Sequence, residues 1–238
     1  MISFVVPAYN EERLLGATLD SIAAAARDCG EAFEVVVADD GSTDGTAAVA
    51  LARGARVVAV AHRQIAATRN SGARAARGEV LVFVDADTRI DAAVLSAALA
   101  ALRSGAVGGG AGLRFDGRVP LYARAFAVLL LAFSRAARLA SGCFVFCTRE
   151  AFETAGGFDE ALFGAEEWAL SRTLARQGRV VIVREAVTTS GRKLRTFSLL
   201  EHLRLFGQFA VRGRRTLRDR RGLDLWYGER REDPEAAS

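Results

Sequence analysis

The first part of this chain alternates short apolar runs with longer segments in which apolar residues recur at helical spacing. The apolar runs are nearly continuous and rich in valine, as in parallel strands that are covered on both faces. This order is typical of βα units around a mainly parallel sheet, and it predicts an α/β fold. The expected strands cover residues 2–6, 34–38, 56–60 and 80–84, and the expected helices cover 11–27, which Asn10 would cap, 43–53, 65–77 and 91–103.

The second half of the chain is less regular. Residues 107–115 include four glycines, which favour a bent or bulged strand that another part of the chain approaches closely, although periodicity alone also allows a loop. No linker rich in proline or serine interrupts the chain, so we expect one domain over residues 1–190 and an appendage over residues 191–238. The other expected helices cover 122–139, 150–155 and 166–177, and the other strands cover 143–147 and 180–183.

The appendage is strongly basic. Residues 192–221 hold ten Lys and Arg against two acidic residues, so this segment carries a charge of +8 and the remainder of the chain −4. Within it, residues 198–210 have the spacing of an amphipathic helix. Such a helix fits a solvated face, an anionic membrane surface or nucleic acid. We favour peripheral contact with an anionic membrane and expect no nucleic acid, because no aromatic platform accompanies the charge.

Composition excludes several classes of protein. With 51% hydrophobic residues, 25% charged residues and three prolines, the chain is neither disordered nor dominated by linkers. The longest apolar run, residues 125–133, is shorter than the ~20 residues that a membrane-spanning helix needs. Because the chain has three cysteines and starts without the pattern of a secretory leader, we expect a cytoplasmic protein with reduced thiols. Peripheral contact with the inner face of the membrane is an additional hypothesis.

Acidic side chains follow two of the expected strands at the points where these strands end. Asp39 and Asp40 follow the second strand, and Asp85 and Asp87 follow the fourth. Because parallel strands end at the same edge of a sheet, we expect these carboxylates to gather there, beside the loop that follows the first strand. Clustered carboxylates suit a hard divalent cation that is shared with substrate phosphates. The alternative is that they only form turns and cap helices.

Four segments, taken in their order along the chain, indicate a more specific function for these loops. They are residues 7–11 (PAYNE), 38–46 (ADDGSTDGT), 67–72 (ATRNSG) and 83–87 (FVDAD). In this order they resemble the motifs of family 2 glycosyltransferases, which have the GT-A fold. The resemblance is close over about residues 1–90, and it continues more loosely through residues 156–160 (GGFDE) and 165–168 (AEEW).

The resemblance implies that residues 1–90 bind a nucleotide-sugar donor and that residues 91–190 bind the acceptor. Asp39 would hold the base and Asp85 the ribose, while Asp85 and Asp87 would hold a diphosphate bridged by Mg²⁺ or Mn²⁺. Such a cation offsets the negative charge that develops on the leaving diphosphate. By the same resemblance, Pro7, Ala8, Tyr9 and Glu11 would line the nucleotide pocket. Arg69, Arg192 and Lys193 are candidate clamps of the diphosphate, because the guanidinium fork of arginine matches phosphate oxygens.

On the acceptor side, Glu167 matches the family's general base, which takes the proton from an attacking hydroxyl. The family more often has aspartate at this position, so Glu166 is the alternative base. A third interpretation is that both carboxylates only stabilise the start of a helix through its dipole. The chain departs from the family at residues 190–193, where many members carry a histidine, and this leaves the last ligand of the metal or phosphate open.

We therefore expect a metal-dependent, inverting glycosyltransferase that moves a sugar from a UDP-sugar to a hydroxyl of a glycan or lipid-linked acceptor. Inversion rests on the resemblance alone. One alternative is transfer to a polyprenyl phosphate, whose oxygen is already ionised and needs no base. Another is a catalytically silent protein that binds nucleotide-sugars or serves as a membrane scaffold. Nucleotidyl transfer is disfavoured, because residues 7–10 lack the glycines and basic side chains that such enzymes use after the first strand.

Overall fold

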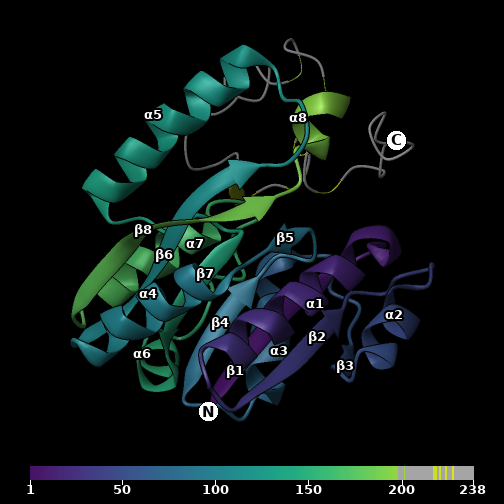
Figure 1. The fold of residues 1–238 in the computed structure, drawn as a ribbon, viewed down its shortest axis with the longest axis horizontal. Coiled ribbons are helices and arrows are strands. Elements are labelled where there is room, and N and C mark those ends of the chain that lie inside the picture. The colour runs from purple at the N-terminus through teal and green to yellow at the C-terminus, as the bar shows by residue number, and fades with distance from the viewer. Residues whose placement is uncertain (198–200, 202–216, 219, 221–222, 224–226, 228–238) are drawn as a thin grey trace.

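The computed structural model describes residues 1–197, 201, 217, 218, 220, 223 and 227. Within them the chain forms one eight-stranded sheet in the order β3-β2-β1-β4-β7-β6-β8-β5, with helices on both faces (Figure 1). The expected amphipathic helix over residues 198–210 lies, except for Glu201, outside the described residues. The strands are β1 (Ile2–Ala8), β2 (Phe33–Asp39), β3 (Arg56–Ala59), β4 (Val80–Val84), β5 (Thr88–Arg89), β6 (Ala106–Phe115), β7 (Phe144–Thr148) and β8 (Arg179–Thr189).

The sheet brings the predicted site loops to one edge. Strand β1 lies between β2 and β4 and is parallel to both, with Ala8 paired to Asp39 and Val5 paired to Phe83. The carboxyl ends of these three strands therefore lie side by side, as expected from the sequence. Strands β7 and β5 run against the other strands of the sheet, so the sheet is mixed but mainly parallel.

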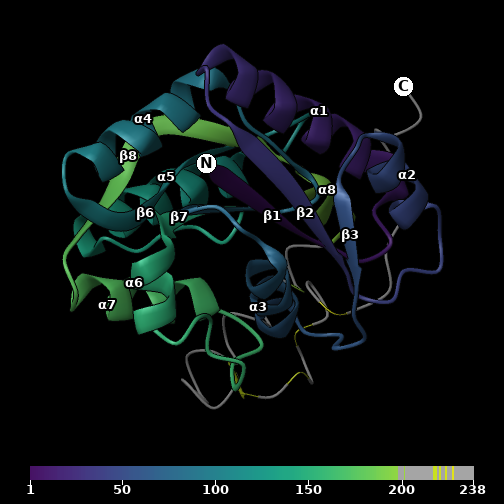
Figure 2. The ribbon, with the colours of Figure 1, turned by 90° about the horizontal axis from the view of Figure 1, so that it is seen from below.

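Helices cover both faces of the sheet. Figure 2 shows α1 and α4 on one face and α3, α6 and α7 on the other, and each group encloses its own buried apolar core. Helix α3 lies very close to β1, because a methyl group on Gly72 would come within 2.5 Å of the Val5 Cγ1 atom. The helices are α1 (Glu12–Asp28), α2 (Thr46–Ala52), α3 (Ile65–Ala75), α4 (Ala92–Arg103), α5 (Leu121–Ala137), α6 (Arg149–Thr154), α7 (Glu166–Ala175) and α8 (Arg192–Thr196).

Strand β6 is the bent, glycine-rich strand that the sequence predicted. Its pairing with β8 shifts register twice, between Ala106 and Gly108 and between Gly110 and Gly112. A methyl group on Gly109 would lie 1.8 Å from the Val181 carbonyl oxygen, so only glycine allows this close approach.

Two expectations about local structure are wrong, and two elements were not expected. Strand β8 continues to Thr189 instead of ending at residue 183. After the second register shift, residues 186–189 of β8 still pair with residues 112–115 of β6, although several residues of this part of β8 are polar. The strand β5 and the helix α8 were not expected. Asn10 does not cap α1: its φ is 51°, and its Oδ1 atom accepts a hydrogen bond from the Thr43 N–H at 2.8 Å. Asn10 thus joins two site loops instead of starting a helix.

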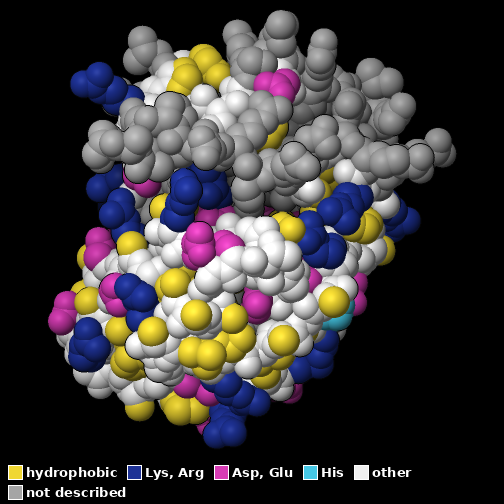
Figure 3. Space-filling model, turned by 90° about the vertical axis from the view of Figure 1, so that its right-hand side faces the viewer, with side chains coloured by type: hydrophobic (Ala, Val, Ile, Leu, Met, Phe, Trp, Pro, Cys, Tyr) yellow, Lys and Arg dark blue, Asp and Glu magenta, His cyan; other side chains and the backbone are white. Residues whose placement is uncertain are grey.

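Three further features concern the helices, the cysteines and the charges on the surface. In the described part of the chain, no helix has both the length and the apolar character needed to cross a membrane. All three cysteines are free thiols in the structure. On the face drawn in Figure 3, acidic and basic side chains lie interspersed over the described residues.

Asp40, the second of the two aspartates after β2, has a structural role. Its Oδ1 accepts hydrogen bonds from the N–H groups of His62 and Arg63 at 2.6 and 2.8 Å. Its Oδ2 accepts from the Gln64 N–H at 3.1 Å and from the Thr68 hydroxyl at 2.9 Å. This buried carboxylate therefore holds the loop that leads into α3.

We predict that Asp40→Ala lowers the free energy of unfolding by about 3 kcal/mol, because buried donors lose a charged acceptor. Urea denaturation followed by circular dichroism measures this change. Asp20→Ala is the matched control, since Asp20 forms an exposed ion pair with Arg53 and should change stability by less than about 1 kcal/mol. Equal effects of the two substitutions would contradict the structural role of Asp40.

Candidate active site

The loops that follow β1 and β2 are fastened to each other and form one wall of the site. The Glu11 N–H donates to the Thr46 hydroxyl at 2.8 Å, and the Asn10 N–H donates to the Ser42 hydroxyl at 2.9 Å. Asp39 ends β2 and is buried, and its Oδ1 accepts from the Ser42 N–H at 3.2 Å. The structure thus brings Asp39 next to the loop after β1, as a shared nucleotide pocket requires.

The other expected pocket residues lie on the same wall. Pro7 and Ala8 complete β1, and Tyr9 follows them. The guanidinium carbon of Arg63 lies 3.6 Å from the centroid of the Tyr9 ring, which is a cation–π contact. Arg63 was not expected at the site, because the sequence carries no signal that the loop before α3 reaches back to β1.

Arg69 of α3 is buried at the centre of this edge, with 2% of its side chain exposed. Its Nη1 donates to Glu166 Oε1 at 2.7 Å, and its Nη2 donates to Asp85 Oδ1 at 2.8 Å and to the Gly142 carbonyl at 2.9 Å. Burial by itself lowers the pKa of Arg69, but Asp85 and Glu166 outweigh burial and raise it. This geometry favours a role as the counter-ion of two carboxylates over the diphosphate clamp expected from the sequence.

Glu167 lies beside this network, in the first turn of α7. Burial, followed by repulsion from Glu166, raises the pKa of Glu167 to about 8, against the attraction of Arg69. A methyl group on Gly142 would lie 3.3 Å from the Glu167 carboxyl carbon, so glycine leaves room for this carboxylate. Because Glu166 is held by Arg69, Glu167 is the better candidate for accepting a proton near neutral pH.

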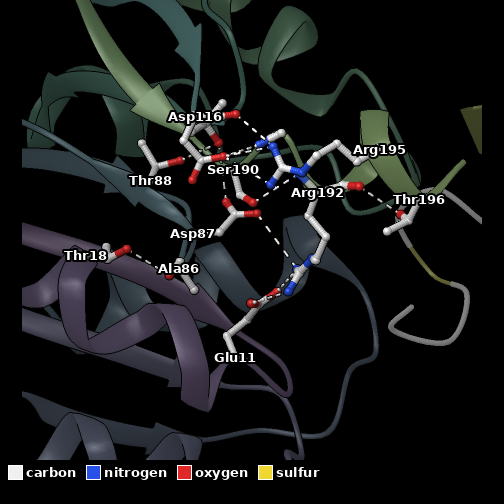
Figure 4. Close-up of polar contacts among 12 residues, drawn as sticks. Glu11, Thr18, Ala86, Asp87, Thr88, Asp116, Ser190, Arg192, Arg195 and Thr196 are labelled. Atoms are coloured by element: carbon white, nitrogen blue, oxygen red, sulfur yellow. Dashed lines mark hydrogen bonds and ion pairs between the residues drawn. The ribbon is translucent and has the colours of Figure 1, made fainter. Parts of the chain in front are cut away.

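A second arginine, Arg192, follows β8 and pairs with Glu11, which follows β1. Arg192 donates from Nη2 and Nη1 to the two carboxylate oxygens of Glu11, at 2.7 and 3.2 Å, and its Nη2 lies 4.0 Å from Asp87 Oδ2 (Figure 4). The residue that follows β8 also holds Asp87, because the Asp87 carbonyl accepts a hydrogen bond from the Ser190 N–H at 3.0 Å. Lys193 belongs to α8, but its side chain lies outside the described part of the structure.

Asp85 and Asp87 supply hard oxygen donors, and their side chains are 34% and 14% exposed. In the described part of the chain, no three His, Cys, Asp or Glu side chains are grouped so that they could hold a metal ion by themselves. Mg²⁺ is commonly held by one or two carboxylates, with substrate phosphates completing its ligands. The donor set therefore fits a divalent cation that binds together with a diphosphate.

Helix α3 also binds residues 156–160, which we expected on the acceptor side from the sequence. Asn70 Nδ2 donates to the Phe158 carbonyl at 2.9 Å and to Glu160 Oε1 at 2.8 Å, and Asn70 Oδ1 accepts from the Phe158 N–H at 2.9 Å. A methyl group on Gly157, whose φ is 78°, would lie 2.8 Å from Asn70 Oδ1. Residues 156–160 therefore dock onto the helix that carries Arg69.

The described residues near the C-terminus also contact this region, which the sequence did not predict. The Tyr227 hydroxyl accepts from the Ile65 N–H at 3.5 Å, and the Tyr227 ring packs edge-on against Phe163 with centroids 5.7 Å apart. Burial, followed by the charge of Glu166, raises the pKa of Tyr227 to about 12. Tyr227 thus lies close to the start of α3 and to Glu166.

Known proteins share this fold and part of this sequence. An undecaprenyl-phosphate 4-deoxy-4-formamido-L-arabinose transferase from Pseudomonas paraeruginosa is 40% identical over an alignment of 99 residues, and the match covers 37% of this chain and 28% of that protein. The first curated relatives that the chain matches are each covered over less than a third of their length.

Two solved structures show the same arrangement of elements. A mannosyltransferase from Pyrobaculum calidifontis in complex with GDP-Man and Mn²⁺ superposes with a TM-score of 0.67 and 24% identity, over 86% of this chain and 59% of that one. Glucosyl-3-phosphoglycerate synthase from Mycobacterium tuberculosis, in complex with Mn²⁺, UDP and glucosyl-3-phosphoglycerate, superposes with a TM-score of 0.60 and 23% identity, over 98% and 81% of the two chains. At these identities the likeness concerns the fold, which is that of the GT-A glycosyltransferases.

The sequence profile described as "Glycosyl transferase family 2" matches residues 3–153, more than half of the chain. The matched region contains β1, β2 and β4 with their loops, Arg69, and both aspartates that follow β4. Together with the fold, this match shows that the chain belongs to glycosyl transferase family 2.

Proposed function

We propose that this protein transfers a sugar from a nucleotide-sugar, with UDP as the nucleotide, to a hydroxyl group with inversion at the anomeric carbon. The wall formed by Asp39 and the loop after β1 supports nucleotide binding at this edge. The solved structures of similar fold contain UDP or GDP-Man together with Mn²⁺, which agrees with a diphosphate and a divalent cation at Asp85 and Asp87.

The observation that carries this proposal is the pair of carboxylates joined through Arg69. Asp85 on the donor side and Glu166 on the acceptor side both bind its guanidinium, and Glu167 with its raised pKa lies next to Glu166. A base for the acceptor is therefore held at a fixed place relative to the carboxylate that serves the donor. This is the geometry that a direct displacement needs, because both reactants must be positioned together.

In the proposed reaction, the acceptor hydroxyl attacks the anomeric carbon while the bond from that carbon to the diphosphate oxygen breaks. Glu167 takes the hydroxyl proton on its carboxylate. Asp85 and Asp87 would hold Mg²⁺ or Mn²⁺, which offsets the charge on the leaving diphosphate. Arg192 lies where its guanidinium can contact the same diphosphate, while Arg69 keeps Asp85 and Glu166 in place.

The second candidate acceptor is a polyprenyl phosphate. The curated relative from Pseudomonas paraeruginosa is named for an undecaprenyl-phosphate acceptor, which is the observation in favour of this variant. A phosphate oxygen is already ionised, so this variant needs no general base. It would also bring the protein to a membrane surface, in agreement with the expected peripheral contact of the basic residues 192–221.

Calorimetric titration with UDP, GDP and dTDP, each with and without Mn²⁺, tests the donor side. We predict that UDP binds at least about tenfold more tightly with Mn²⁺, and that Asp87→Ala removes this gain. Asp28→Ala, which changes an exposed carboxylate at the end of α1, is the control and should bind as the wild type does. Failure of all three diphosphates to bind would remove the basis of the transferase proposal and favour a silent scaffold.

Glu167→Gln tests the acceptor side. We predict a rate lower by a factor of about 10²–10⁴, because the hydroxyl proton loses its acceptor. In the wild type the rate should rise with pH through about 8, as Glu167 loses its proton, and this rise should be missing from the residual rate of the variant. Glu150→Gln, at an exposed position of α6, is the control. Full activity of Glu167→Gln would instead favour the polyprenyl phosphate acceptor.

A further inference from the structure

Two arginines of the short helix α8 pair with carboxylates in different parts of the structure. Arg192 makes a forked contact with Glu11 and approaches Asp87, whereas Arg195 contacts Asp116 at 3.4 Å (Figure 4). Glu11 is buried with 4% of its side chain exposed, and Asp87 and Arg192 are each 14% exposed. Arg192 therefore lies at the candidate metal site, and Arg195, which contacts Asp116, belongs to the same group of polar side chains (Figure 4).

Charge repulsion links Arg192 to any metal that binds Asp87. The guanidinium lies 4.0 Å from Asp87 Oδ2, so a divalent cation on this carboxylate would bring two further positive charges to within a few ångströms of it. The surroundings are largely buried, and screening by water is weaker there than at an open surface. A metal ion and the guanidinium in its present place therefore oppose each other.

A nucleotide diphosphate would relieve this opposition. Its oxygens can accept hydrogen bonds from a guanidinium fork and at the same time coordinate a metal ion. If Arg192 moves from Asp87 toward the diphosphate, the negative charge of the ligand separates the two cations. Glu11 fixes the other side of the guanidinium, so the movement requires only that the side chain pivots between neighbouring acceptors.

We propose that Arg192 is the resident counter-ion of Glu11 and Asp87, and that it competes with a divalent cation for Asp87 until a nucleotide diphosphate binds. This inference rests on the proposed function, because it concerns the same donor site. It assigns to Arg192 a positioning role that acts before the reaction. The protein then binds metal weakly on its own and strongly together with the nucleotide, so each ligand raises the affinity for the other.

The test measures Mn²⁺ binding to the full chain without nucleotide, by calorimetry or by electron paramagnetic resonance of free Mn²⁺. We expect Arg192→Met to bind Mn²⁺ at least about tenfold more tightly than the wild type, because a neighbouring positive charge is removed. Arg103→Met, which removes a cation that pairs with Glu31 at the end of α4, is the control and should stay within about twofold of the wild type. Arg192→Lys keeps the charge and should also stay near the wild type. A structural defect would not produce a gain in affinity.

Three results would overturn the proposal. The first is an Arg192→Met affinity equal to or below that of the wild type, provided that circular dichroism shows a folded variant; Arg192→Gln serves as the neutral variant if it does not. The second is an equal gain in Arg103→Met or Arg192→Lys. The third is a gain that persists in the double variant Arg192→Met/Asp87→Asn, which would place the metal elsewhere.

Measurements of nucleotide binding distinguish a failure of this inference from a failure of the proposed function. If the wild type binds no nucleoside diphosphate while Arg192→Met still binds Mn²⁺ more tightly, the donor assignment fails and the competition at Asp87 stands. If the wild type binds UDP and Mn²⁺ together while Arg192→Met shows no gain without nucleotide, the donor assignment stands and the competition fails.

Discussion

The site depends on the burial of a single guanidinium. A charge that is removed from water is costly unless it is paired and hydrogen-bonded. The two terminal nitrogens of Arg69 meet this requirement with Asp85, Glu166 and the Gly142 carbonyl, whereas its buried Nε has no partner among the described residues. These partners come from the end of β4, the start of α7 and the segment before β7. The need to pair one buried charge therefore holds together three segments that are far apart in the sequence, and it fixes the distance between Asp85 and Glu166.

The two arginines of the site differ in whether a bound ligand can take over the contacts of the side chain. Arg69 lies at the bottom of the site, where the loss of its charge would leave two carboxylates without their counter-ion. Arg192 lies nearer the rim, and a metal ion together with a diphosphate can take over its contact with Asp87. We infer that the first arginine fixes the geometry of the site and that the second responds to the ligand. The carboxylates of Asp85 and Asp87, which only Ala86 separates in the sequence, thus have different neighbours.

The sequence predicted the framework of this site better than its contacts. Strands β1, β2 and β4 were expected within three residues of their bounds, because buried parallel strands leave nearly continuous apolar runs. The partners of Arg69 were not predicted, since spacing along a chain does not reveal which carboxylates meet in the folded state. The extension of β8 to Thr189 was missed for a related reason. The polar residues of this extension do not form the apolar pattern of a strand, and its pairing with β6 depends on register shifts that the sequence does not reveal.

The most direct test of this account is the pKa of Glu167, measured by carbon-13 NMR titration of the glutamate carboxyl groups, with Glu167→Gln identifying the signal. The account predicts a pKa near 8 in the wild type, and it predicts that Arg69→Met raises the pKa of Glu167 further, because Arg69 attracts its negative charge. An ordinary glutamate pKa at Glu167, or a Glu167 pKa that Arg69→Met leaves unchanged, would contradict it.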